Sequence, residues 1–169
     1  MLFRRDPGRR GLLIAVGACA LVFSAACERG ASSSSHDRPA TVVGPEHRFE
    51  LTVGGQLIRL RLAIHESEQQ RGLMNVASMP EDEGMLFVYA EPRQMSFYMR
   101  NTKIPLDIGF FDARGTLREI HPMYPGVEDS VRSRSTELTL ALEMNQGWFT
   151  THQVKPGATI DLAALREAL

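Results

Sequence analysis

Residues 97–111, FYMRNTKIPLDIGFF, restrict the fold of this chain more than any other stretch. Apolar and polar residues alternate on both sides of a short polar segment, and alternation with a period of two predicts half-buried β-strands. Pro105 lies between the two runs. Because proline fixes its own φ and keeps the preceding residue extended, one straight central strand cannot continue through it. We therefore predict a strand over 95–100, a connection, and a second strand that begins at Leu106.

The alternation also assigns the faces of these two strands. Met95, Phe97 and Met99 share the core face of the first strand. Arg100 and Asp107 fall on the opposite faces, close to the connection between the strands. The sequence therefore predicts a polar joint at the end of two apolar runs.

Turn signals predict the first elements of the domain. Residues 47–53 and 57–64 alternate on either side of a Gly-Gly dipeptide, which predicts a β-hairpin. Ser67 is followed three residues later by Gln70, a capping-box pattern that predicts a short helix ending near residue 73 or 74. Gly72 near that end suits a C-terminal exit.

The later part of the chain is also patterned as strands. The continuous apolar run 85–89 predicts a strand that is covered on both faces. Further strands are predicted over 116–121, 136–144 and 158–162, with a long surface loop over 121–135. About eight short strands and one short helix predict a mainly-β fold, an antiparallel sandwich or barrel.

The first 26 residues have the pattern of a secretory signal peptide. Four arginines precede an apolar run of thirteen residues, which is too short for a comfortable membrane span. Small residues then lead directly into Cys27, as in lipoprotein signals, where the cysteine is diacylated and becomes the mature N-terminus. Ordinary cleavage nearby is the alternative. Both cysteines of the chain lie within residues 1–27, so the mature domain can form no internal disulfide.

The segment after Cys27 and the charge of the mature chain restrict its partners. Residues 27–45 are rich in Ser, Gly and Pro and are predicted to form a flexible tether, with one domain over 46–169. Such a tether spans about 20–25 Å. Without residues 1–26 the formal net charge is −4, which disfavours nucleic-acid binding. We expect a periplasm-facing lipoprotein, in the outer membrane rather than the inner, because Glu28 is not the Asp that favours inner-membrane retention in enteric bacteria.

Four motifs occur together in the domain, over 71–74 (RGLM), 83–87 (EGMLF), 97–107 (FYMRNTKIPLD) and 142–148 (LEMNQGW). Their order and content resemble the bacterial and archaeal family catalogued as domain of unknown function 192. The resemblance extends over roughly residues 46–162. It implies a compact, mainly-β fold related to jelly-roll sandwiches that is often exported, and it implies no activity.

Seven polar or aromatic residues are candidates for ligand binding. Arg100 or Arg71 would hold an anionic or hydroxylated ligand, while Asn101 and Asp107 would orient it. The structural alternative is an ion pair between Arg100 and Asp107, worth less than about 1 kcal/mol if exposed. The complete set of candidates is Arg71, Glu83, Arg100, Asn101, Asp107, Glu143 and Trp148.

Two of these candidates have specific alternatives. Glu83 ends an acidic cluster over 81–83, which most simply forms a solvated loop, although the buried strand that follows would draw Glu83 inward. Trp148 would form a sugar-stacking platform with Tyr98, or else close one end of a sheet.

The pattern of the chain favours a non-enzymatic module, since no catalytic serine or metal-hydrolase motif is present. We expect a binding or accessory module that recognises a small polar ligand, a glycan or an envelope protein, with no cofactor. A first alternative is an envelope polysaccharide hydrolase that uses Glu83 and Asp107 as paired carboxylates. A second is copper binding by methionines, against which methionine is an ordinary core residue. The methionines concerned lie within 26 residues: Met74, Met79, Met85, Met95 and Met99.

Histidines give no reason to predict a metal site. The five of them are scattered along the chain without short or helical spacing, so zinc ligation would require chance convergence. We predict no metal.

Overall fold

The computed structural model describes residues 47–169, so the predicted signal peptide, the lipidation site at Cys27 and the tether lie outside the described residues. Within this part, the chain forms eight strands and three short helices, which confirms the predicted mainly-β fold. None of these helices has the length and apolar character needed to cross a membrane. In chain order the elements are β1 (Phe49–Val53), β2 (Gln56–Ala63), α1 (Glu66–Arg71), β3 (Glu83–Arg93), β4 (Ser96–Phe97), β5 (Leu106–Asp112), β6 (Leu117–Met123), β7 (Val131–Arg132), β8 (Leu138–Asn145), α2 (Trp148–Thr151) and α3 (Leu162–Ala168).

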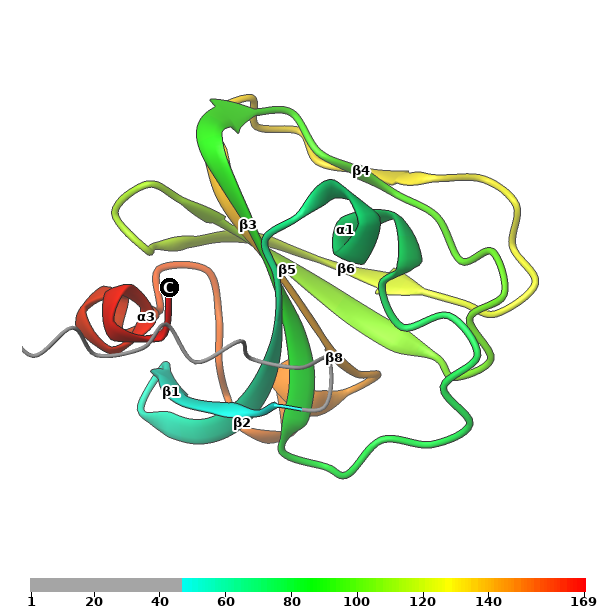
Figure 1. Ribbon diagram of the computed structural model, residues 1–169, viewed down its shortest axis with the longest axis horizontal. Helices are drawn as coiled ribbons and strands as arrows, with labels where there is room; N and C mark the ends of the chain where they lie inside the picture. The colour runs from blue at the N-terminus through cyan, green and yellow to red at the C-terminus, as the bar shows by residue number, and fades with distance from the viewer. Residues whose placement is uncertain (1–46) are drawn as a thin grey trace, which may run out of the picture. The chain divides into compact units, whose positions relative to one another are not determined.

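Six strands form one sheet in the order β1-β2-β3-β8-β5-β6, and β4 pairs with β7 in a separate two-stranded sheet (Figure 1). The six-stranded sheet is mixed and is not closed into a barrel. Its neighbours are antiparallel except for β2 and β3, which are parallel. A parallel pair needs a crossover connection, and here the chain between the two strands contains α1.

Apolar residues cover both faces of the large sheet. One cluster includes Leu86 and Leu142 and packs under the C-terminal segment, with Trp148 of α2 and Leu165 of α3. The other includes Phe87 and lies under β4, β7 and the loop after α1. Because side chains alternate along a strand, the successive residues of β3 supply both clusters. The predicted burial of this strand on two faces is confirmed.

The predicted hairpin at the start of the domain is confirmed. β1 and β2 are antiparallel, with Val53 opposite Gln56. Gly54 and Gly55 make the turn with φ values of 57° and 84°. Two successive positive φ angles match the right-handed twist of the flanking strands, which is why a Gly-Gly pair predicts this turn.

β5 and β6 form a second hairpin, from the strand predicted to begin at Leu106 and the strand predicted over 116–121. Asp112 organises its turn, since the Asp112 carboxylate accepts hydrogen bonds from the backbone N–H groups of Arg114 and Thr116, both at 2.9 Å. Arg118 also donates to this carboxylate. These donors lower the pKa of Asp112, although burial alone would raise it.

The helix prediction was wrong in its boundaries. α1 begins after His65 rather than Ser67, and the residue that reaches back is Glu68. Its carboxylate accepts from the N–H groups of Ile64 and His65, each at 2.9 Å. The helix ends at Arg71 with Gly72 as its C-cap, before residue 73. The sequence pattern therefore identified the helix but not its first residue. The capping box that forms is that of His65 and Glu68, two residues before the predicted box of Ser67 and Gln70.

The predicted strand over 158–162 is also wrong. The segment makes only two isolated bridges, Ile160 to Val53 and Thr159 to Thr116. It lies between the ends of the two hairpins and pairs with each for a single residue. α3 then follows, unpredicted, with Asp161 as its N-cap accepting from two backbone N–H groups.

The region around the polar joint differs from the prediction as well. Strand character over 95–100 is confined to β4, because its partner β7 offers only two residues. The predicted face is nevertheless confirmed, since Met95, Phe97 and Met99 are all buried in the second cluster. The predicted loop over 121–135 contains the end of β6 and all of β7. β3 continues to Arg93, beyond the end of the strand predicted over 85–89.

Candidate functional site

The two groups expected to pair at the joint lie apart. β4 belongs to the small sheet and β5 to the large one, so the strands are not neighbours. The guanidinium of Arg100 lies over the ring of Tyr98, 5.6 Å from its centroid. Asp107 is 8% exposed and its carboxylate accepts from the N–H of Gly147 at 2.8 Å. The predicted ion pair between Arg100 and Asp107 is therefore wrong.

The polar residues of the joint mostly shape the backbone. Asn101 has a φ of 57°, and its carbonyl accepts from the N–H of Asn75 at 2.9 Å. The N–H of Thr102 bonds the carbonyl of Met99 at 3.1 Å, which closes the turn into β5. Burial raises the pKa of Asp107, against the hydrogen bond from Gly147. The joint is a tight turn that links the loop after α1 to the start of β5.

The two carboxylates of the hydrolase alternative do not form a pair. The Glu83 side chain is 13% exposed and contacts Arg48 at 3.2 Å and Arg59 at 3.3 Å. Along β3 it shares its face with Met85, which belongs to the second cluster. Asp107 is opposite Met144, a member of the first cluster, and so faces the other side of the sheet. The geometry gives no support to the paired-carboxylate mechanism.

Trp148 packs in the first apolar cluster, whereas Tyr98 follows Phe97 of the second cluster, so the two rings form no stacking platform. It is 3% exposed, and its Nε1 donates to Asp82 at 3.2 Å. One of its neighbours is the ring of His152, which stacks on it at 4.6 Å. Trp148 is thus a buried residue of the first cluster.

The methionines of the copper alternative also have structural surroundings. Met85, Met95 and Met99 are buried in the second cluster, and Met79 packs against it. Their neighbours there include aromatic rings, among them Phe87, with which thioethers pack well. Met74 lines the cavity described next.

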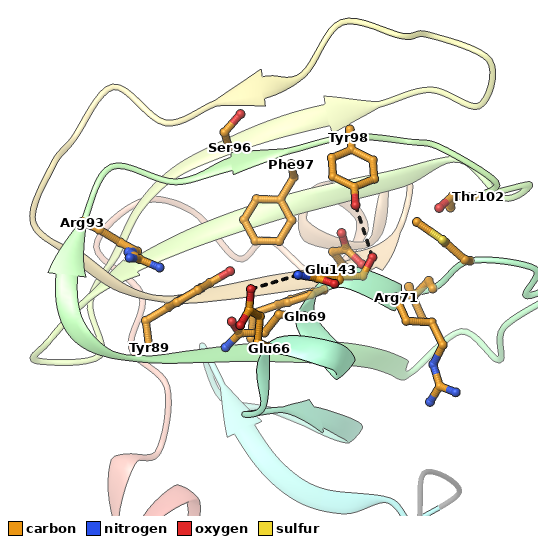
Figure 2. Close-up of a pocket in the computed structure, with 15 residues that line it drawn as sticks. Glu66, Gln69, Arg71, Tyr89, Arg93, Ser96, Phe97, Tyr98, Thr102 and Glu143 are labelled. Atoms are coloured by element: carbon orange, nitrogen blue, oxygen red, sulfur yellow. Dashed lines mark hydrogen bonds between the residues drawn. The ribbon is translucent and has the colours of Figure 1, made fainter.

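A cavity of about 270 Å³ lies between α1, β3 and the β4 segment (Figure 2). α1 supplies Gln69 and Gln70, and β3 supplies Tyr89. Tyr98 lies just after β4, and Glu143 comes from β8. Four separate parts of the sequence therefore meet around one hollow, and the first of them includes the loop after α1 that carries Met74.

Glu143 lies at the middle of the large sheet, on the side that faces the cavity. In register it is opposite Met85 of β3 and Ile108 of β5, both members of the second apolar cluster. It is 6% exposed. Within residues 47–169, its Oε2 atom is buried and has no hydrogen-bond partner. Burial raises the pKa of Glu143 to about 8, so its carboxyl group is mostly protonated at neutral pH.

The wall formed by α1 is held firmly against the sheet. The Gln69 amide donates to the carbonyl of Val88 at 2.9 Å and also reaches those of Ala63 and Ile64. Tyr98 Oη donates to the carbonyl of Gln70 at 3.3 Å, which joins the helix to the β4 segment. These bonds fix the cavity between elements that would otherwise be separate.

β3 contributes an aromatic ring and a cation to the cavity. Burial raises the pKa of Tyr89, and the charge of Glu143 acts in the same direction while that of Arg93 opposes it. The guanidinium of Arg93 lies 5.0 Å from the centroid of the Tyr89 ring. Figure 2 shows Arg93 and Tyr89 on the same side of the cavity.

Of the seven predicted ligand-binding residues, the cavity brings together only Arg71 and Glu143. Figure 2 shows the guanidinium of Arg71 pointing away from Glu143, so Arg71 contributes its stem to the wall. Sequence reasoning missed Gln69, Tyr89 and Arg93 as site residues. One signal was present: Glu143 is the only charged residue in the apolar run LALEM of β8.

Comparison with known proteins was consistent with the motifs. The family DUF192, described as "Uncharacterized ACR, COG1430", matches residues 49–162. A solved structure from Sinorhizobium meliloti, named as a candidate transcription regulator, is 32% identical with a TM-score of 0.64, covering 68% of this chain and 92% of that one. A solved protein of unknown function from Novosphingobium aromaticivorans is also 32% identical with a TM-score of 0.64, covering 68% of this chain and 84% of its own. No curated protein matches the chain.

Proposed function

The chain belongs to the DUF192 family, and we propose that this member is a non-enzymatic module that binds a small polar ligand in the cavity above Glu143. The proposal moves the site from the joint at 100–107 to the hollow between α1, β3 and the β4 segment. It keeps the expected class of function and changes the residues that perform it.

The observation that carries this proposal is the unpaired carboxyl group of Glu143. A buried polar atom without a hydrogen bond costs about 1–3 kcal/mol. Buried polar groups in proteins are nearly always paired, and an unpaired one with a perturbed pKa in a cleft is typical of a functional site. A ligand that completes the hydrogen bonding of Oε2 would recover this cost on binding.

The dimensions of the cavity support a small ligand. Its volume of about 270 Å³ is near the lower end of the range for small-molecule sites. The wall formed by α1 is attached to β3 through Gln69 and to the β4 segment through Tyr98. A site whose walls are already fixed loses little conformational entropy when a ligand binds.

We place this module on the periplasmic side of the bacterial envelope, held by a lipid on Cys27 and favouring the outer membrane. The support is the signal-peptide pattern of residues 1–26, the small residues before Cys27 and the tether composition of 27–45. The partners in this proposal are the membrane, through its anchor, and the small ligand.

A Glu143→Leu variant tests the proposed site. Leucine removes both carboxyl oxygens and suits apolar neighbours such as Met85 and Ile108. We expect the free energy of unfolding to rise by roughly 1–3 kcal/mol, because the unpaired polar atom is gone. We also expect loss of ligand binding, measured by two-dimensional NMR against a library of small polar compounds. Gain of stability with loss of function is the signature of a site.

The matched control is Glu137→Leu, which removes an exposed carboxylate outside the cavity. It should leave both binding and the NMR shifts of Tyr89 and Tyr98 unchanged. If Glu143→Leu loses stability, or if library compounds bind it as well as they bind the wild type, the carboxyl group is structural. The proposed function would then be wrong.

A further inference from the structure

The charges around the cavity restrict the class of its ligand. The titratable and charged groups that face it come from four elements: Glu66 and Arg71 from α1, Tyr89 and Arg93 from β3, Tyr98 beside β4, and Glu143 from β8. The Arg71 guanidinium points away from Glu143, so Glu66 and Arg93 are the formally charged groups left at the wall, one negative and one positive. Which of the two is free to meet a ligand therefore decides the sign of the charge that the cavity attracts.

The two carboxyl groups differ in how they are satisfied. Glu66 accepts a hydrogen bond from Nε2 of Gln70 at 2.9 Å, within the same helix. Glu143 Oε2 has no partner among the described residues. Because Glu143 has a pKa of about 8, its group holds a proton at pH 7 and can donate a hydrogen bond. A buried acid kept neutral in this way suits an oxygen acceptor on the ligand.

Arg93 is the cation placed to meet a negative charge. Among residues 47–169 it has no carboxylate partner, and its guanidinium lies over the ring of Tyr89. Arg93 lowers and Glu143 raises the pKa of Tyr89, so both charged groups lie near its hydroxyl. A ligand lying along Tyr89 would reach both groups.

We propose that the ligand is a short organic acid, with its carboxylate at Arg93 and a second oxygen that accepts a hydrogen bond from Glu143. This inference rests on the proposed function, because it assumes that the cavity is the binding site. It specifies the charge of the ligand, its second polar group and its orientation in the cavity. Arginine is suited to the carboxylate end since its planar donors match two carboxylate oxygens.

Four probes with the same four-carbon chain test the proposal: 4-hydroxybutanoate, butanoate, 1,4-butanediol and 4-amino-1-butanol. Affinities are measured on the purified protein by NMR titration. We expect 4-hydroxybutanoate to bind most tightly, butanoate and the diol more weakly because each lacks one of the two groups, and the amine most weakly. Arg93→Gln should weaken the hydroxy acid about tenfold or more, while leaving the diol unchanged.

Arg100→Gln is the matched control for Arg93→Gln. Arg100 also lies over a tyrosine ring, that of Tyr98, at 5.6 Å, but it does not line the cavity. Its removal should change the affinity for 4-hydroxybutanoate very little. Equal losses in the two variants would mean that the acid responds only to the overall charge of the protein, and would overturn the assignment of Arg93.

The pH dependence tests the role of Glu143 separately. Between pH 7 and pH 9 the acid probe stays ionised, and Tyr89 stays protonated because its pKa is raised. Glu143 loses its proton over this range, so the dissociation constant of the wild type should rise about tenfold. In Glu143→Gln the amide N–H₂ replaces the donor without titrating, so binding should persist and its affinity should not vary with pH.

The possible failures are distinguishable. If the amine binds best, or if affinity rises with pH, the ligand is a cation and the inference is wrong while the binding site remains. If library compounds occupy the cavity but none of the acids does, the ligand is neutral. The inference is then wrong as well, while the binding site remains. If nothing in the library or among the probes shifts the cavity signals, the proposed function fails as well.

Discussion

Glu143→Gln is expected to change how the stability of the protein depends on pH. Ordinary carboxylates have a lower pKa in the folded state, and they destabilise a protein when acid protonates them. Glu143 has the opposite shift, from 4.5 to about 8. The folded state therefore binds a proton more tightly than the unfolded state. The contribution of Glu143 to stability is fully present below pH 4.5 and is lost as the pH rises towards 8.

The size of the effect follows from the shift. One pKa unit corresponds to about 1.4 kcal/mol, so the whole shift is worth roughly 5 kcal/mol as an upper figure. Between pH 5 and pH 7 the wild type should lose roughly 2 kcal/mol of this contribution. Glutamine has nearly the same shape and does not titrate. Relative to the wild type, the variant should therefore gain about that amount of stability over the same interval.

Urea unfolding at pH 5, 6, 7 and 8 measures this difference. Trp148 is the single tryptophan of the chain and is buried, so its fluorescence reports unfolding. Subtracting the wild type from the variant at each pH removes the contributions of all other titrating groups. The control Glu137→Gln changes an exposed carboxylate and should follow the wild type. Parallel curves for Glu143→Gln and the wild type would show that Glu143 is ionised in the folded protein, and the donor argument would be refuted.

Three further predictions concern other parts of the chain. Burial alone would raise the pKa of Glu119, but N–H donors from Ser135 and Arg134 and a bond to His121 lower it to about 2. Glu119→Gln should lower the free energy of unfolding by about 2 kcal/mol at pH 7. It should also remove the loss of stability expected as the pH falls from 4.5 towards 2, and a variant that still loses the same stability over this range would contradict the prediction. Gly109→Ala should lower the free energy of unfolding in urea by about 1–3 kcal/mol, because the added Cβ would lie 2.8 Å from Cζ of the buried Phe149 ring. An unchanged free energy of unfolding would show that this ring moves aside freely. Cys27→Ser should abolish labelling by a clickable fatty acid and release the protein from the membrane fraction. If the wild type is not labelled either, the proposed lipid anchor is wrong.

The candidate site shows which residues sequence reasoning can find. Glu143 was included among the candidates, but the alternation of apolar and polar residues along β8 would equally place its side chain on a solvent-exposed face. It is buried only because α1, the β4 segment and the loop after α1 cover that face of the sheet. Arg93 lies beyond the strand predicted over 85–89, yet β3 continues past a register shift after Val88 and pairs Arg93 with Leu138. The site could not be predicted because its walls come from four separate segments of the sequence.

The sequence by itself determined the elements whose causes are local. Gly54-Gly55 sets a turn that brings β1 onto β2, and alternation places Met95, Phe97 and Met99 on one buried face. The apolar run of β3 requires cover on both sides. These features depend on backbone preference and side-chain period, which neighbouring residues along the chain express directly.

Only the tertiary structure decided the pairings and the burial of polar groups. The parallel contact of β2 with β3, the separation of Arg100 from Asp107, and the reduction of the last strand to two bridges depend on distant partners. The same is true of Glu143, whose charge state depends on what packs above it. Burial and hydrogen bonding are properties of the assembled layers, and a carboxyl group changes from solvated to neutral only when those layers close around it.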